Sequence, residues 1–201
     1  TPGVLFVASR IHQQNDNSPN RLTPEKLCDW YENIHIQQVV ALSGIPSAAR
    51  YEALPIPSPS SAHPEPLSSN PPSPSPPSST SSPLTQPKYN AQDEPFSNQA
   101  PWLTVYEMPD LEFRSSKEFK GLDGQSEPER GLLEGVFRRA RFDTRFYEEV
   151  GRWEGEGGRG SPAPFLLTAA LAPSDDADFN AWYQSEHFLL LSRIPGFRRT
   201  R

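Results

Sequence analysis

The stretch Asp29-Trp30-Tyr31-Glu32-Asn33-Ile34-His35, followed ten residues later by Ile45-Pro46, decides how the chain is organised. A second stretch, Ala181-Trp182-Tyr183-Gln184-Ser185-Glu186-His187, is followed by Ile194-Pro195. In both, a histidine lies four residues after the tyrosine of a Trp-Tyr pair, and an Ile-Pro pair follows. The pattern therefore predicts two copies of one structural unit.

The residues around the first copy predict a strand, a helix and a return strand. Residues 3–9 form a short apolar run rich in β-branched and aromatic side chains, which is typical of a buried strand. Thr23-Pro24-Glu25 predicts a helix start, since threonine caps helices and proline fits their first turn. We expect the helix to end before Pro46, and residues 47–54 to form the return strand.

A proline- and serine-rich segment interrupts this unit at residues 55–101. It contains almost no large apolar side chains, so it buries too little surface to offset the entropy of ordering. We predict a disordered insertion with partial polyproline II character. A strand resumes at residues 102–106, so the insertion interrupts a domain and does not separate two domains.

The rest of the first unit is predicted to contain a short helix from Asp110 to Gly121, a loop at 123–135 and an alternating strand at 142–153. We therefore assign residues 1–153 to the first unit and the glycine-rich residues 154–163 to a linker.

Residues 164–201 repeat the start of the first unit. We expect a strand at 164–171, a helix capped by Asp175 or Asp176, and a return strand at 197–201. The latter half of this second unit is missing, which indicates a fragment or a truncated gene model.

The predicted fold class is α+β. Strand, helix, strand, strand, helix, strand is the order of a ferredoxin-like (split β-α-β) repeat, which carries its helices on one face of an antiparallel sheet. The face of the sheet that carries no helices must pack against another layer of structure. A second copy would provide it, either within the chain as a pseudo-dimer or between chains as a homodimer.

The Trp-Tyr-x-x-x-His pattern, the Ile-Pro that follows it and the basic-aromatic return strand resemble the dimeric α/β barrel superfamily. More narrowly, the chain is similar to EthD-like proteins in the tandem-repeat form common in filamentous fungi. The resemblance covers residues 3–54, 102–153 and 164–201. It implies a barrel with a pocket between sheet and helices, in a family that includes polyketide cyclases, decarboxylases, isomerases and cofactor-independent oxygenases.

The resemblance also implies that His35 and His187 lie at the pocket. An imidazole there can move a proton during enolisation, cyclisation or decarboxylation. Tyr31 and Tyr183 precede these histidines by four residues and so share their helix face, where a hydroxyl can orient a phenolic or carbonyl substrate. The alternative is structural, with each histidine bonding the last carbonyls of its helix.

Three further residues are candidates for substrate binding. Arg50 is suited to a substrate carboxylate because guanidinium forms bidentate pairs, although a surface role is the alternative. Trp30 and Trp182 are candidates too, but their helical spacing also fits packing on the sheet. We expect no metal and no cofactor, since the histidines and the single Cys28 lack ligand spacing.

Charge and composition limit the kinds of partner and the cellular compartment that we expect for this chain. The net charge of −6 argues against a nucleic-acid or anionic-membrane surface. No apolar run reaches the roughly 18 residues of a membrane span, and a single cysteine favours a reducing compartment, so we expect a cytoplasmic protein.

Two functions remain open from the sequence. One is a cofactor-independent enzyme acting on a small aromatic or polyketide-like substrate, with a pocket histidine as general acid and base. The other is a non-catalytic dimerisation or scaffold protein whose proline-rich insertion binds partners through Pro-x-x-Pro spacing.

Overall fold

The computed structural model describes residues 1–12, 19, 21–54, 100–155, 163–169 and 171–201. The predicted insertion at 55–101 and the predicted linker at 154–163 therefore lie largely outside the described residues.

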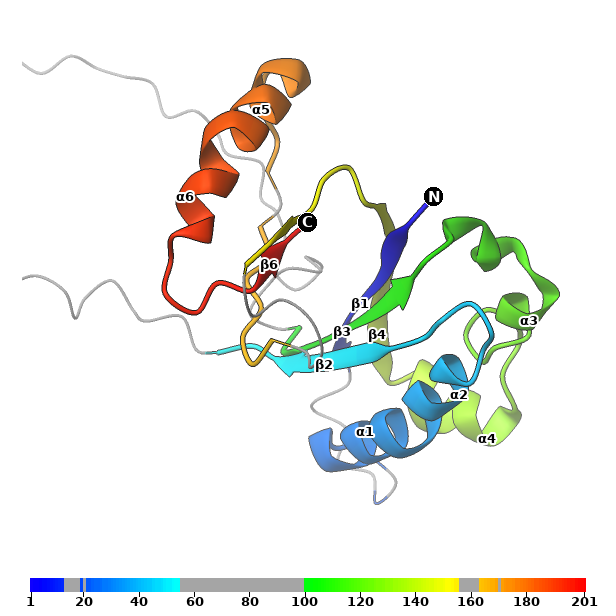
Figure 1. The fold of residues 1–201 in the computed structure, drawn as a ribbon. Coiled ribbons are helices and arrows are strands. Elements are labelled where there is room, and N and C mark those ends of the chain that lie inside the picture. The colour runs from blue at the N-terminus through cyan, green and yellow to red at the C-terminus, as the bar shows by residue number, and fades with distance from the viewer. Residues whose placement is uncertain (13–18, 20, 55–99, 156–162, 170) are drawn as a thin grey trace, which may run out of the picture.

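A four-stranded antiparallel sheet forms the centre of the structure (Figure 1). Its strands are β1 (Gly3–Ile11), β2 (Ala48–Glu52), β3 (Trp102–Met108) and β4 (Ala140–Glu148), in the spatial order β2-β3-β1-β4. The apolar run at the start of the chain thus becomes an inner strand, hydrogen-bonded to β3 on one side and β4 on the other. The predicted α+β class is confirmed.

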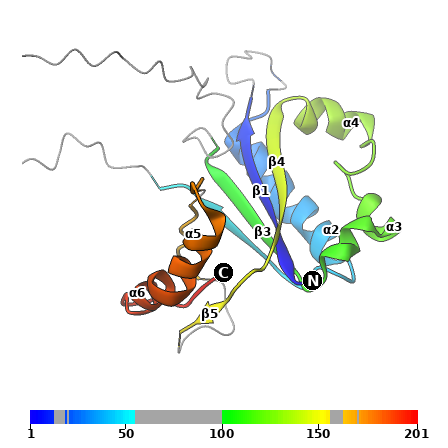
Figure 2. The ribbon, with the colours of Figure 1, turned by 90° about the horizontal axis from the view of Figure 1, so that it is seen from above.

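Short helical segments cover one face of the sheet, as the view from above shows (Figure 2). Between β1 and β2 the chain forms α1 (Pro24–Trp30), the π-helical turn η1 (Tyr31–His35) and α2 (Ile36–Val40). Between β3 and β4 it forms the 3₁₀ turn η3 (Leu111–Ser115), α3 (Lys117–Lys120), α4 (Arg130–Leu132) and the π-helical turn η4 (Leu133–Phe137).

Side-chain caps set the starts of several of these segments. The Thr23 hydroxyl accepts a hydrogen bond from the Lys26 amide at 3.3 Å, with Pro24 in the first turn, as the sequence predicts. Asp110 caps η3 by accepting from the Glu112 amide, and Ser116 caps α3 by accepting from the Phe119 amide.

The core lies between this helical layer and the sheet. Strand β3 alternates strictly, with its even-numbered residues buried, as expected for a strand with one face toward a core. Two apolar clusters result. The first comprises Leu5, Val7, Val39, Ile45, Tyr106, Met108, Leu111 and Phe119. The second comprises Ile11, Leu22, Leu27, Trp102, Val136 and Ala140.

Two predictions about the first unit need correction. The expected loop at 123–135 ends in helix, because α4 and η4 begin at Arg130 and bury Val136 in the second cluster. The expected strand at 142–153 is β4, which ends at Glu148. Strand β1 starts at Gly3, which pairs with Glu148, so the ladder ends there apart from one hydrogen bond from the Glu149 amide to the Pro2 carbonyl, and Trp153 pairs with Thr200 of β6.

The C-terminal residues form a smaller unit. Its helix is α5 (Asp176–Trp182), the π-helical turn η5 (Tyr183–His187) and α6 (Phe188–Ser192), and Asp175 caps it. The short strands β5 (Trp153–Glu154) and β6 (Arg199–Thr200) pair with each other. This unit lies on the face of the main sheet opposite α1 and α2 (Figure 2).

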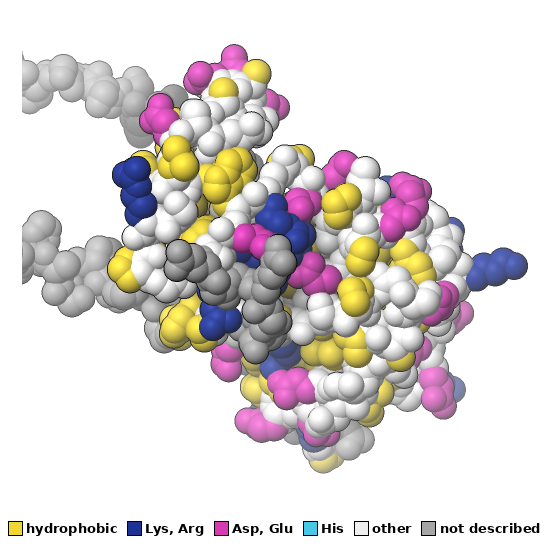
Figure 3. Space-filling model, in the orientation of Figure 1, with side chains coloured by type: hydrophobic (Ala, Val, Ile, Leu, Met, Phe, Trp, Pro, Cys, Tyr) yellow, Lys and Arg dark blue, Asp and Glu magenta, His cyan; other side chains and the backbone are white. Residues whose placement is uncertain are grey.

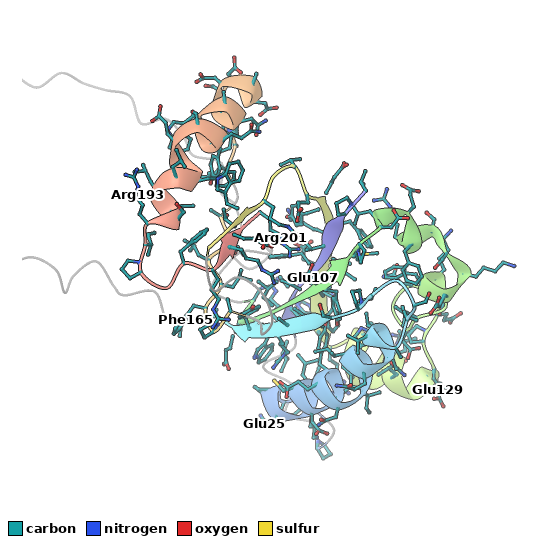
Figure 4. The ribbon with its side chains drawn as sticks, viewed as in Figure 1. Glu25, Glu107, Glu129, Phe165, Arg193 and Arg201 are labelled. Atoms are coloured by element: carbon teal, nitrogen blue, oxygen red, sulfur yellow. The ribbon has the colours of Figure 1, made fainter. Side chains whose placement is uncertain are left out.

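The strand expected at 164–171 does not form in residues 163–169 and 171. Strand β1, its counterpart, has a hydrogen-bonded neighbour on each side, whereas this segment pairs with no described strand. Its apolar side chains remain exposed, with Phe165 (labelled in Figure 4) 75% accessible and Leu167 89%.

Ion pairs centred on Glu107 of β3 hold the end of the chain against the main sheet. Both terminal nitrogens of Arg201 donate to the Glu107 carboxylate at 2.8 Å, and Arg199 lies 3.4 Å away. Arg201 also lies 3.6 Å from Glu149. Figure 3 shows basic and acidic side chains side by side where Figure 4 labels Glu107 and Arg201. Bidentate geometry and partial burial make this pairing stronger than a typical surface pair.

We predict that Glu107→Gln loosens the C-terminal unit. The substitution removes the bidentate acceptor of Arg201 and should cost about 1 kcal/mol of local stability. Amide hydrogen exchange in β5, β6 and α6 should accelerate, while exchange in β1 stays unchanged. Glu112→Gln, which changes an exposed glutamate in η3, is the control. Equal exchange in both variants would show that the pair does not hold this unit.

Candidate functional site

A cavity of about 340 Å³ lies between the main sheet and the helical layer. The wall formed by the sheet consists of Leu5, Val7, Tyr106, Ala140, Arg141, Phe142 and Thr144. The helical wall consists of Trp30, Tyr31, His35, Val39, Phe119 and Phe137, and the loop Leu122–Gln125 closes one end. The cavity thus combines aromatic and aliphatic side chains with several polar groups, a mixture that can bind a small molecule.

The π-helical turn η1 determines how the first motif meets this cavity. The Ile36 amide donates to the Tyr31 carbonyl, five residues back, in place of the four-residue step of an α-helix. The wider turn brings Trp30 and His35 together: their rings stack with centroids 5.0 Å apart and planes 24° apart. The Tyr31 ring contacts both, with its centroid 5.2 Å from the imidazole at a tilt of 58° and 5.6 Å from Trp30.

His35 is a half-buried imidazole with an unsatisfied nitrogen. Its Nδ1 atom is buried and has no hydrogen-bond partner among the described residues. Burial lowers the pKa of His35 below its ordinary value, and the negative charge of Asp123 partly opposes this shift. The neutral form therefore dominates near neutral pH, with one ring nitrogen free to accept a proton.

A tight turn places Asp123 at the end of the cavity. The Gln125 amide donates to the Leu122 carbonyl at 3.0 Å, which closes the turn. Gly124 has a φ of 88°, a conformation that favours glycine. A β-carbon at Gly124 would also approach the Phe137 ring to 3.0 Å, so glycine is required here on two grounds.

Two buried tyrosines form the polar part of the cavity wall. The Tyr106 hydroxyl donates to the Tyr31 hydroxyl at 3.5 Å. Burial raises the pKa of both phenols, and hydrogen bonds from Tyr106 and Thr104 partly oppose the shift at Tyr31. Both phenols therefore keep their protons at physiological pH; Tyr106 donates its proton to Tyr31, so the Tyr31 hydroxyl is the one that can donate to a ligand oxygen. Sequence reasoning identified Tyr31 but missed Tyr106, whose only signal was its inward position on an alternating strand.

Arg50 does not line the cavity. It lies on β2, where its guanidinium pairs with Glu32 and donates to the Cys28 sulfur at 3.0 Å. It also lies 5.9 Å from the ring centre of Trp102. These contacts connect β2 to α1 and occupy the group that the sequence assigned to a substrate carboxylate.

The second motif repeats the local geometry of the first. Trp182 and His187 stack at 4.6 Å and 29°, and Tyr183 lies 4.6 Å from the imidazole at 57°. The Phe188 amide donates to the Tyr183 carbonyl in a second π-helical turn. However, Trp182, Tyr183 and His187 do not line the cavity, and Trp182 is 39% exposed. Of the two motifs, the structure brings only the first to this cavity.

Two further searches cover the described residues alone. No three His, Cys, Asp or Glu side chains there are grouped as metal ligands. Every helix in that part of the chain is too short or too polar to cross a lipid bilayer.

Comparisons with known proteins do not identify the function of this site. No family model matches the chain, and no curated protein and no solved structure matches it.

We predict that His35 titrates below the ordinary histidine pKa of 6.5 and that its titration contributes to acid destabilisation. Because the folded-state pKa is lowered, the unfolded chain binds the proton more tightly. This contribution to stability is therefore complete above about pH 6.5 and is lost as the pH falls through the folded-state pKa. Imidazole NMR titration measures the pKa, and denaturant unfolding at several pH values measures the stability.

His35→Phe is the matched variant for this prediction, since a phenyl ring can still stack on Trp30 without titrating. In this variant, the free energy of unfolding should depend less on pH between the folded-state and unfolded-state pKa values of His35. A His35 pKa at or above the ordinary value would contradict the buried, unsatisfied imidazole.

Proposed function

We propose that this chain is a cofactor-independent enzyme that moves a proton on a small aromatic or polyketide-like substrate bound in the cavity. The reaction class is that of cyclases, decarboxylases and isomerases, which pass through an enol or enolate. The observation that carries the proposal is His35, whose imidazole lines the cavity and has its pKa lowered by burial.

The fold supports the same proposal. The order of elements and the strand order β2-β3-β1-β4 fit a ferredoxin-like repeat, and we propose that the chain is an EthD-like member of the dimeric α/β barrel superfamily. The matching π-helical turns favour a tandem origin for the two motifs. A barrel would then arise from pseudo-dimeric or homodimeric packing of two such sheets.

The chemistry assigned to each residue follows from its protonation state. His35 in its neutral form accepts a proton from a carbon next to a substrate carbonyl. The electron pair moves onto the carbonyl oxygen, and the Tyr31 hydroxyl, which accepts a hydrogen bond from Tyr106, donates its own proton to that oxygen. Return of the proton from His35 to carbon or oxygen completes an isomerisation. Trp30 and Phe142 provide the apolar surface against which an aromatic substrate packs.

A second candidate function is a dimerisation or scaffold protein. It is favoured by the exposed apolar side chains of the C-terminal unit: Phe165, Leu167, Leu171, Leu190 and Ile194. Large exposed apolar surface is typical of protein interfaces. The proline-rich insertion assigned to partner binding lies outside the described residues.

The test follows proton exchange and needs no knowledge of the natural substrate. 2-Tetralone is a bicyclic aromatic ketone with enolisable protons, and it exchanges them for deuterium in heavy water. The protein should accelerate this exchange by about 100-fold over buffer, the lower end of general acid–base catalysis. Mass spectrometry measures the incorporated deuterium.

His35→Phe should remove this acceleration while retaining the fold, as checked by circular dichroism. His12→Ala is the control, since His12 is exposed and lies outside the cavity lining. Exchange that survives in His35→Phe, or that is lost in His187→Ala instead, would overturn the assignment to His35. Absence of acceleration by the unmodified protein would favour the scaffold function.

A further inference from the structure

The charged residues near the cavity decide what kind of ligand it accepts. Among the described residues, Asp123 and Arg141 are the charged members of the lining. An arginine that reached the cavity would favour a carboxylate or phosphate, whereas an aspartate would repel it. The orientation of these two side chains is therefore the central question.

Arg141 faces away from the cavity. On β4 its neighbours Ala140 and Phe142 belong to the face that packs on the core, and side chains alternate along a strand. Arg141 pairs directly with Arg10 of β1, so these two side chains share the opposite face of the sheet. Arg141 therefore contributes backbone, and not its guanidinium, to the lining.

Arg50 does not replace it. Its guanidinium pairs with Glu32 and lies against Cys28, and Arg50 is absent from the cavity lining. Asp123, by contrast, lines the cavity together with His35, and its negative charge opposes the lowering of the His35 pKa. The charge facing the cavity is therefore negative, next to hydroxyl donors and aromatic rings.

We infer that the cavity selects an uncharged aromatic ligand with a carbonyl or phenolic hydroxyl, and that Asp123 determines specificity by excluding carboxylates. This inference rests on the proposed function and narrows it to isomerisation or cyclisation of uncharged substrates, which removes decarboxylation of acids from the proposed reactions. A carboxylate entering the cavity would lose water, meet no cation and face the Asp123 charge. A carbonyl or phenol oxygen would instead meet the Tyr31 hydroxyl, which accepts from Tyr106 and keeps its own proton to donate.

Two probes of the same shape test the inference. 2-Naphthol is uncharged at neutral pH, and 2-naphthoate carries one negative charge on the same bicyclic ring. Calorimetry gives both dissociation constants, and the NMR signal of His35 reports whether each probe occupies the cavity. We expect 2-naphthol to bind more tightly. Asp123→Asn should reduce the ratio of the two constants about fivefold, which is about 1 kcal/mol, mainly by tightening 2-naphthoate.

Glu127→Gln is the matched control, because it removes a negative charge from an exposed side chain just beyond the same turn and outside the cavity lining. It should leave the ratio unchanged. Circular dichroism and the unfolding midpoint verify that Asp123→Asn is folded.

Equal or tighter binding of 2-naphthoate by the unmodified protein would overturn the inference, as would a ratio unaltered by Asp123→Asn. Failure of both probes to shift the His35 signal would overturn it too. Selective binding of 2-naphthol without proton exchange in 2-tetralone would leave this inference standing and remove the proposed catalysis. The two proposals therefore fail through different observations.

Discussion

Pairing of strand β1 on both edges is the constraint on which the rest of the structure depends. Over residues 3–9, each position faces a partner on β3 and another on β4. Its side chains then alternate, with Leu5 and Val7 toward the helical layer and Phe6 and Ala8 toward the opposite face. All four are buried, so the first apolar run of the chain contributes buried side chains to both faces of the sheet, and Leu5 and Val7 also line the cavity.

The wall of the cavity contains a π-helical turn and a buried polar atom, and both involve His35. The π-helical turn η1 stacks His35 on Trp30, and this packing keeps an imidazole nitrogen out of water without a partner. A buried polar atom of this kind costs free energy. The negative charge of Asp123 partly opposes the lowering of the His35 pKa by burial. The packing that buries His35 against Trp30 therefore also lowers the pKa of its imidazole.

The sequence predicts the elements better than the site. Alternation at 102–106, the Thr23-Pro24 cap and the 47–54 strand all lead to observed elements, because these signals are local. Tyr106, Asp123 and the role of Arg50 depend on which distant segments meet, and spacing along one strand or turn carries no such information. Gly131 and Gly135 suggested a loop where Leu132 and Val136 pack as a helix, since tertiary burial overrides weak propensity.

The π-helical turns relate the contact between the tryptophan and the histidine to the number of residues that separates them. In both motifs the tryptophan and histidine are five positions apart and stack, whereas an α-helix would rotate each residue by about 100° and direct such a pair to different sides. Loss of one residue between Trp30 and His35 would leave them four positions apart, a spacing at which an ordinary α-helix places both side chains on one face. The π-helical turn is therefore what keeps the tryptophan and the histidine in contact across a spacing that is one residue longer.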